Sequence, residues 1–154
     1  MEKILVSACL LGEKVRYDGA GKTLQHGIWE LWQDDGRLVS ICPEVSGGLS
    51  IPRLAAEMMG DDNVINTKGD DMTAAFVAGA ERALRLAQKH NIRLAVLKEN
   101  SPSCGSQFVY DGTFSGTKKA GQGITAALLR KNGIDVFSED ELEQAQKFLQ
   151  KIEA

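Results

Sequence analysis

Three cysteines follow three apolar segments of this 154-residue chain, and they are the residues best placed to carry chemistry. Cys9 comes after Ile4-Leu5-Val6, Cys42 after residues 38–41, and Cys104 shortly after residues 94–97. Ligands of open α/β sheets bind beyond the carboxyl ends of the strands, so thiols from distant parts of the chain could converge there. Three thiolates form an incomplete ligand set for a metal, and the missing ligand is where a reaction could occur.

The sequence leaves the kind of metal open. A structural zinc would want a fourth protein ligand, and the only histidines are His26 and His90. His90 ends an expected helix, where a cation suits the helix dipole, and we interpret it as structural; His26 is either a ligand or a solvated loop residue. A zinc ion with three cysteines and water, or an iron–sulfur cubane with one open iron, would act as a Lewis acid. For any single cysteine, burial as a small apolar side chain is the alternative.

Polar residues beside the cysteines extend the candidate site. Glu44, two residues after Cys42, has the chemistry of a general base, although its spacing fits a surface carboxylate equally well. Ser101 and Ser103 precede Cys104 and could donate or relay protons, or could simply form a turn.

Two other segments could form the wall of a binding pocket. The segment from Arg16 to Gly19 combines a cation, a ring and the carboxylate of Asp18, with a solvated loop as the alternative. Gly121 and Gly123 stand at an expected helix start, where backbone N–H groups could receive an anion or a carbonyl oxygen. We interpret the tryptophans of the expected short helix 27–33 as packing residues.

Short apolar segments alternate with helical patterns, which is typical of an α/β fold. We predict one domain over residues 1–154, an open, mainly parallel sheet flanked by helices, with a small β-hairpin. A tight hairpin is expected at Tyr110–Thr113, because Asp-Gly tolerates positive φ angles. Thr73 is the expected cap of the clearest helix, and Ser138 of the last. The expected strands cover 4–6, 38–42, 93–97 and 135–137, the expected helices 27–33, 70–90, 124–131 and 139–151, and a polar loop 12–23.

Composition restricts the partners. The net charge of −3 gives no broad basic field, so we expect no stable nucleic-acid binding, although a local basic patch at Lys118-Lys119 is possible. No apolar stretch approaches the roughly 20 residues that span a bilayer, and the first residues become polar too soon for a signal peptide. We therefore expect a cytoplasmic monomer without a membrane partner. The absence of a Cys-x-x-Cys pair argues against thioredoxin-like chemistry and a zinc ribbon.

The combined motifs resemble the thiouracil desulfurase family of small bacterial proteins. The similarity runs from about residue 4 to 137, and its segments are 7–12, 15–19, 42–45, 47–49, 52–53, 97–98, 101–105, 110–114 and 121–126. After Arg53 the chain departs from the family pattern, because Leu54-Ala55-Ala56-Glu57 stands where members favour a proline-rich stretch. That difference concerns the shape of a nearby loop and the fit of a substrate.

The resemblance implies an oxygen-sensitive [4Fe-4S] cluster on Cys9, Cys42 and Cys104, with the fourth iron free. The thiocarbonyl sulfur of a thiopyrimidine would bind that iron. Glu44 would activate water for attack on the ring carbon, Ser101 would assist, and uracil and sulfide would form without net redox change.

Four further residues are expected to contact the substrate: Arg16, Asp18, Ser103 and Gly123. The sulfide acceptor stays open. One alternative is an enzyme that handles sulfur of thionucleosides, nucleotides or tRNA. Another, from a different class, is a non-catalytic metal-binding sensor module.

Overall fold

The computed structural model describes residues 1–21 and 24–154, and a parallel sheet forms its centre. The strands are β1 (Ile4–Ser7), β2 (Leu38–Ile41), β5 (Leu94–Leu97) and β8 (Asp135–Ser138), in the order β2-β1-β5-β8. All residues of β1 and β5 are buried, as expected for parallel strands covered on both faces. The predicted α/β class is therefore correct.

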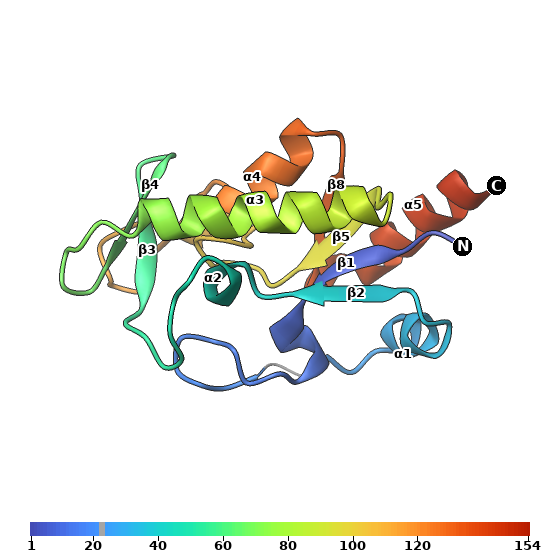
Figure 1. Cartoon of the computed structure of the whole chain (residues 1–154), viewed down its shortest axis with the longest axis horizontal. Coiled ribbons are helices and arrows are strands. Elements are labelled where there is room, and N and C mark those ends of the chain that lie inside the picture. The colour runs from blue at the N-terminus through green and yellow to red at the C-terminus, as the bar shows by residue number, and fades with distance from the viewer. Residues whose placement is uncertain (22–23) are drawn as a thin grey trace.

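Two helices cover each face of this sheet (Figure 1). On one face α1 (Gly27–Asp34) and α5 (Leu142–Glu153) pack through Trp29, Trp32 and Leu149. On the other face α3 (Thr73–Lys89) and α4 (Ile124–Lys131) pack through Ala83 and Leu129, among others. Trp29 and Trp32 are each 1% exposed, so their interpretation as packing residues is confirmed.

Short elements gather at the end of the molecule toward which the strands run, opposite the two termini (Figure 1). They comprise two antiparallel hairpins and three short helical segments. The hairpins are β3 (Ala56–Met59) with β4 (Asn63–Asn66), and β6 (Phe108–Tyr110) with β7 (Lys118–Ala120). The helical segments are η1 (Ala8–Leu11), α2 (Pro43–Ser46) and η2 (Glu139–Glu141).

Three details differ from the sequence-based expectations. Strands β6 and β7 are joined by a loop of residues 111–117 rather than a tight turn, because Gly112 and Phe114 donate their N–H groups to Glu57 on β3. The β3–β4 hairpin was not expected. Thr73 is the first residue of α3 rather than its cap, and its hydroxyl accepts a hydrogen bond from Val64.

Other expectations agree with the structure. Ser138 forms a complete capping box with Glu141 before α5. His90 ends α3 as its C-cap, and His26 caps α1 by accepting the Ile28 N–H. In the predicted loop 12–23, Lys22 and Thr23 lie outside the described residues.

Helix α2 lies directly against α3 because glycines remove the side chains between them. A Cβ atom built on Gly79 would stand 1.9 Å from the carbonyl oxygen of Pro43. One built on Gly47 would stand 2.1 Å from the carbonyl oxygen of Ala75. Any larger residue would force the two helices apart, so this contact fixes the height of α2 above the sheet.

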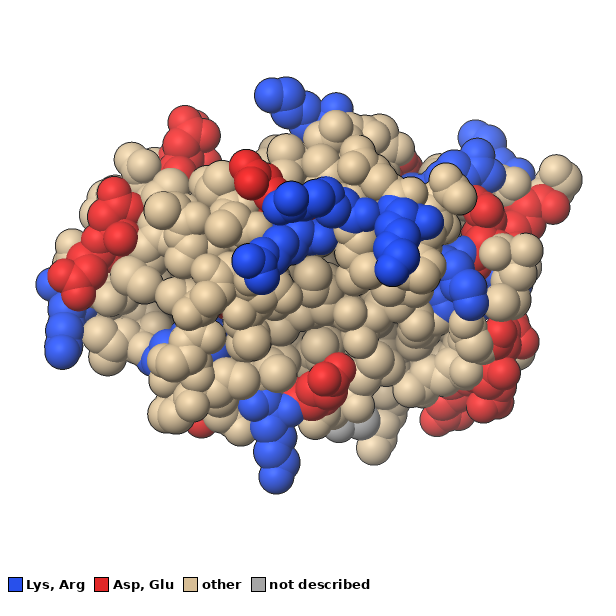
Figure 2. Space-filling model, viewed as in Figure 1, with Lys and Arg blue, Asp and Glu red and all other residues tan. Residues whose placement is uncertain are grey.

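Charges of both signs are spread over the face that carries α3 (Figure 2). Basic side chains gather along that helix, where Arg82, Arg85 and Lys89 are exposed, and acidic ones lie mostly toward the two ends. Of the helices in the described part of the chain, none is both long and apolar enough to cross a membrane.

Candidate active site

A cavity of about 530 Å³ opens where the central strands end. Its wall includes Ser7, Ile41 and Lys98, which end or directly follow β1, β2 and β5. Cys9, Cys42 and Cys104 all line it. The structure thus brings the three thiols to one cavity, as parallel strands with a common carboxyl edge would place them.

Local backbone structure fixes the first two cysteines. Cys9 lies in η1, which ends at Gly12, a residue with φ of +89° whose N–H donates to the Cys9 carbonyl at 3.0 Å. Cys42 is the N-cap of α2, and Pro43 follows as the first helical residue, where its missing N–H costs no hydrogen bond. The sulfur of Cys42 lies 3.8 Å from the carbonyl oxygen of Val15.

The third cysteine lies in a loop held by α4. Cys104 donates its N–H to the Ser101 hydroxyl at 2.7 Å, and Gly105 donates to the Ser101 carbonyl at 2.9 Å. The first residues of α4 donate backbone N–H groups to Pro102 and Ser103 carbonyls at 2.8 to 3.2 Å. The N-terminus of α4 therefore holds the Cys104 loop by hydrogen bonds, because the first N–H groups of a helix have no partner within the helix.

Burial governs the protonation of the thiols. It raises the pKa of the Cys9 thiol to about 11 and that of Cys104 to about 12, and it also raises the pKa of Cys42. Lys98 and Arg16 oppose this at Cys9 through their positive charge. The thiols therefore stay protonated until a metal or another cation stabilises the thiolates.

Glu44 lies on α2 and lines the same cavity as the three thiols. Its Oε1 lies 3.2 Å from Nη2 of Arg53, and both side chains are mostly buried, 18% and 8% exposed. Burial raises the pKa of the Glu44 carboxyl, and Arg53 opposes the shift. Burial thus increases the tendency of the Glu44 carboxylate to take up a proton, which is what a general base needs.

Ser101 also lines the cavity. Its hydroxyl oxygen accepts the Cys104 N–H, and a hydroxyl has one proton left to donate. The residue can therefore hold the cysteine loop and donate a hydrogen bond into the cavity at the same time.

The structure separates the four expected substrate-binding residues. Arg16 lines the cavity, whereas Asp18, Ser103 and Gly123 do not. The Asp18 carboxylate accepts the Ala20 N–H at 3.0 Å. The Ser103 side chain is fully buried, with its hydroxyl 2.7 Å from that of Thr125.

Gly123 supports the cysteine loop from outside the cavity. Its N–H donates to the Gly105 carbonyl at 2.8 Å, and a Cβ atom there would stand 2.4 Å from the Ser103 carbonyl carbon. The N–H groups at this helix start therefore receive carbonyl oxygens of the protein itself.

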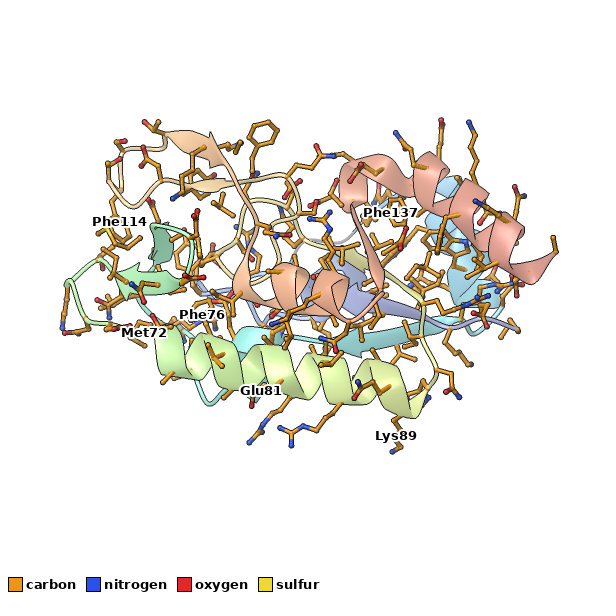
Figure 3. All side chains as sticks on the ribbon, turned by 90° about the horizontal axis from the view of Figure 1, so that it is seen from above. Met72, Phe76, Glu81, Lys89, Phe114 and Phe137 are labelled. Atoms are coloured by element: carbon orange, nitrogen blue, oxygen red, sulfur yellow. The ribbon has the colours of Figure 1, made fainter. Side chains whose placement is uncertain are left out.

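Sequence reasoning did not assign several side chains of the cavity. Lys98 pairs with Glu139 at 3.0 Å; since it directly follows β5, the strand-end rule could have found it. Tyr110 and Phe114 add rings, and Figure 3 shows Phe114 at the hairpin end of the molecule. Glu57, the single carboxylate of an apolar segment, also lines the wall.

The donor set fits an iron–sulfur cluster better than a single metal ion. Among the residues that the structure describes, no three His, Cys, Asp or Glu side chains lie close enough together to hold one ion. Thiolates of a cubane bind different irons and therefore stand further apart than ligands of one zinc. The three cysteines are free of disulfides and line a cavity large enough for a cluster, and cations lie near Cys9 and Cys42.

Comparison with known proteins agrees with this geometry. A [4Fe-4S]-dependent thiouracil desulfidase, TudS, has a solved structure that matches with a TM-score of 0.95 and 50% identity, over 97% of this chain and 99% of that one. An uncharacterized protein of Bacillus subtilis (strain 168), YbbK, is 43% identical over 148 residues, 90% of this chain and 97% of that protein. The model of the 2-thiouracil desulfurase family matches residues 4–141, and the chain belongs to that family.

Proposed function

We propose that this protein is a thiouracil desulfurase that converts thiouracil and water to uracil and hydrogen sulfide. The observation that carries the proposal is the convergence of Cys9, Cys42 and Cys104 on one cavity that also contains Glu44. Family membership and the similarity to a [4Fe-4S]-dependent thiouracil desulfidase support the same activity.

Cys9, Cys42 and Cys104 would hold the [4Fe-4S] cluster. When bound, a cluster with three protein ligands supplies an iron free to act as a Lewis acid toward the soft thiocarbonyl sulfur. Lys98 and Arg16 lie near enough to Cys9 to lower its pKa, so they offset part of the negative charge of the thiolates.

Glu44 takes the proton of the attacking water. Oxygen adds to the ring carbon and the carbon–sulfur bond breaks. The sulfur takes up both protons of the water, one of them returned by Glu44, and leaves as hydrogen sulfide, so the carbon keeps its oxidation state. Arg53 keeps the Glu44 carboxylate in place, at 3.2 Å. The Ser101 hydroxyl, fixed by the Cys104 N–H, donates a hydrogen bond to the reacting group.

The test is made on protein reconstituted without oxygen. We expect about four irons and four sulfides per chain, and release of sulfide with formation of uracil from 2-thiouracil. Cys104→Ser should lose the cluster, whereas Glu44→Gln should keep it and lose turnover by about 100-fold or more, within the range for a general base. Glu81→Gln, on the exposed side of α3, is the matched control and should behave as wild type.

One outcome would refute the proposed activity, and another would refute only the role of Glu44. Zinc in place of iron, with no turnover of any thiopyrimidine, would indicate a binding module instead of an enzyme. Full activity of Glu44→Gln would remove this carboxylate from the reaction even if the desulfurase activity itself is observed.

A further inference from the structure

Glu57 is a carboxylate in the cavity wall that the reaction described above does not use. It lies on β3, between Ala56 and the fully buried Met58, and is 8% exposed. A carboxylate is rarely buried to this degree without partners, because removal from water is costly. Its partners therefore indicate what the residue does.

One carboxylate oxygen is occupied by the protein. Oε1 of Glu57 accepts the N–H of Gly112 at 2.9 Å and the N–H of Phe114 at 3.1 Å. Gly112 has φ of +93°, and a Cβ atom there would stand 2.7 Å from the carbonyl oxygen of Met58. The loop is thus pressed against β3, and the carboxylate is fixed in orientation by two backbone donors.

The second oxygen of Glu57 is not fully buried. Within the described residues, Oε2 of Glu57 makes no hydrogen bond, whereas every fully buried side-chain oxygen has a hydrogen-bond partner. Oε2 is therefore accessible, and the residue lines the cavity together with the rings of Tyr110 and Phe114. A fixed acceptor beside aromatic rings matches a flat heterocycle that carries an N–H group.

We propose that Glu57 determines substrate specificity by accepting a ring N–H of the substrate at Oε2. This inference rests on the proposed function and adds the substrate class: cyclic thioamides with an N–H next to the thiocarbonyl carbon. A substrate without that N–H leaves a buried carboxylate unpaired, which is the situation that gives polar sites their strongest discrimination. The bond also sets which ring carbon is presented to Glu44.

Glu57→Gln separates this role from a structural one. The amide oxygen of glutamine can still accept both N–H groups of the loop, but its NH₂ group donates where Oε2 accepted. The loop is retained and only the polarity of the group facing the substrate is reversed. Glu57→Ala removes both functions and serves as the comparison for loss of the loop.

The experiment compares reconstituted wild type and Glu57→Gln on 2-thiouracil, its 1-methyl and 3-methyl derivatives, and the 1,3-dimethyl derivative. We expect Glu57→Gln to lower kcat/KM for 2-thiouracil by about 10- to 100-fold, as loss of a charged hydrogen bond does. For one of the two monomethyl isomers, the kcat/KM of the wild type should be lower than for 2-thiouracil by the same factor. The variant should show no further loss of kcat/KM on that isomer. An unchanged kcat/KM of the variant for 2-thiouracil would overturn the assignment. So would a loss of kcat/KM in the variant that is as large for the dimethyl compound as for 2-thiouracil.

A binding measurement keeps this test separate from the proposed function. Calorimetry with uracil on the same reconstituted preparations should show weaker binding to Glu57→Gln than to wild type by a similar factor. Equal affinities, or no binding to wild type, would contradict the role of Glu57. Absence of sulfide release from wild type, together with weaker uracil binding by the variant, would refute the desulfurase proposal alone.

Discussion

The guanidinium of Arg53 holds the carboxylate of Glu44 through a single oxygen. Nε and Nη2 of Arg53 lie 3.3 and 3.2 Å from Oε1 of Glu44. The remaining donors of the same group reach the carbonyl oxygens of Val15 at 3.1 Å and Ser50 at 3.1 Å. Because the Val15 carbonyl also lies 3.8 Å from the sulfur of Cys42, Arg53 ties the candidate base to the surroundings of a candidate metal ligand.

Arg53→Lys should lower kcat by about 10- to 100-fold while the cluster is retained. A lysine keeps the positive charge but cannot bond Glu44 and two carbonyls in one plane, so the carboxylate loses its orientation. Iron content and steady-state kinetics measure the two effects separately. Arg85→Lys on the exposed side of α3 is the control. A kcat within twofold of wild type would show that the charge alone is sufficient.

Gly123→Ala should weaken both the fold and the retention of iron. The added methyl group would stand 2.4 Å from the Ser103 carbonyl carbon, so α4 or the cysteine loop must shift, at about 1–3 kcal/mol. Thermal unfolding and iron per chain after desalting measure this. Gly27→Ala is the matched control, since no atom lies within 4 Å of its new Cβ and it begins a helix. Equal iron content in both variants would contradict the positioning role of Gly123.

Gly79→Ala should destabilise the protein through the contact between α2 and α3. Its Cβ would stand 1.9 Å from the Pro43 carbonyl oxygen, which the backbone can relieve only by moving α2 and with it Glu44. We expect a loss of about 1–3 kcal/mol in urea unfolding and a lower kcat per cluster. Val77→Ala, at an exposed position of the same helix, should change neither by much. An unaltered unfolding midpoint for Gly79→Ala would rule out the close packing.

Glu153→Gln should reduce stability only above the pH at which Glu153 titrates. The hydrogen bond from Arg37, 3.0 Å long, lowers the pKa of the Glu153 carboxyl. A carboxyl whose pKa is lower in the folded state stabilises the protein when the pH is above the unfolded-state pKa. This stabilisation is lost as the pH falls through the folded-state pKa. At pH 7 the variant should lose at most about 1 kcal/mol, because the pair lies at the surface with side chains 14% and 28% exposed, where solvent screens the charges. The difference from wild type should shrink as the pH falls below the ordinary titration range of glutamate, as measured by urea titrations at pH 7 and at successively lower pH values; a constant difference would contradict this account.

The convergence of the cysteines could be predicted from the sequence because it depends only on the pairing of a few parallel strands. Apolar segments before Cys9 and Cys42 form neighbouring parallel strands, so their carboxyl ends lie at one edge. The roles of Gly123 and Ser103 were harder to predict. A glycine before a helix indicates a possible anion site in the sequence. Only the packed structure shows that carbonyl oxygens of the Cys104 loop accept the N–H groups at this helix start.

The surroundings of Glu57 could not be predicted for a similar reason. The hairpin β3–β4 has few of the β-branched or aromatic residues that indicate strands, since β3 reads Ala-Glu-Met-Met. The loop 111–117 follows the Asp-Gly rule locally, with Gly112 at positive φ, but widens because its donors reach β3, more than 50 residues earlier in the chain. Such distant contacts leave no periodic pattern in the sequence.

The order of the strands also dictates when the site can exist during synthesis. The central strand β1 is made first, but its partner β5 ends at Leu97, and the loop of Cys104 is gripped by α4, which ends at Lys131. A ribosome-bound chain that has not yet released α4 has no finished cavity. The proposed cluster could therefore be inserted only after α4 has formed, and until then the three cysteines do not share a finished cavity.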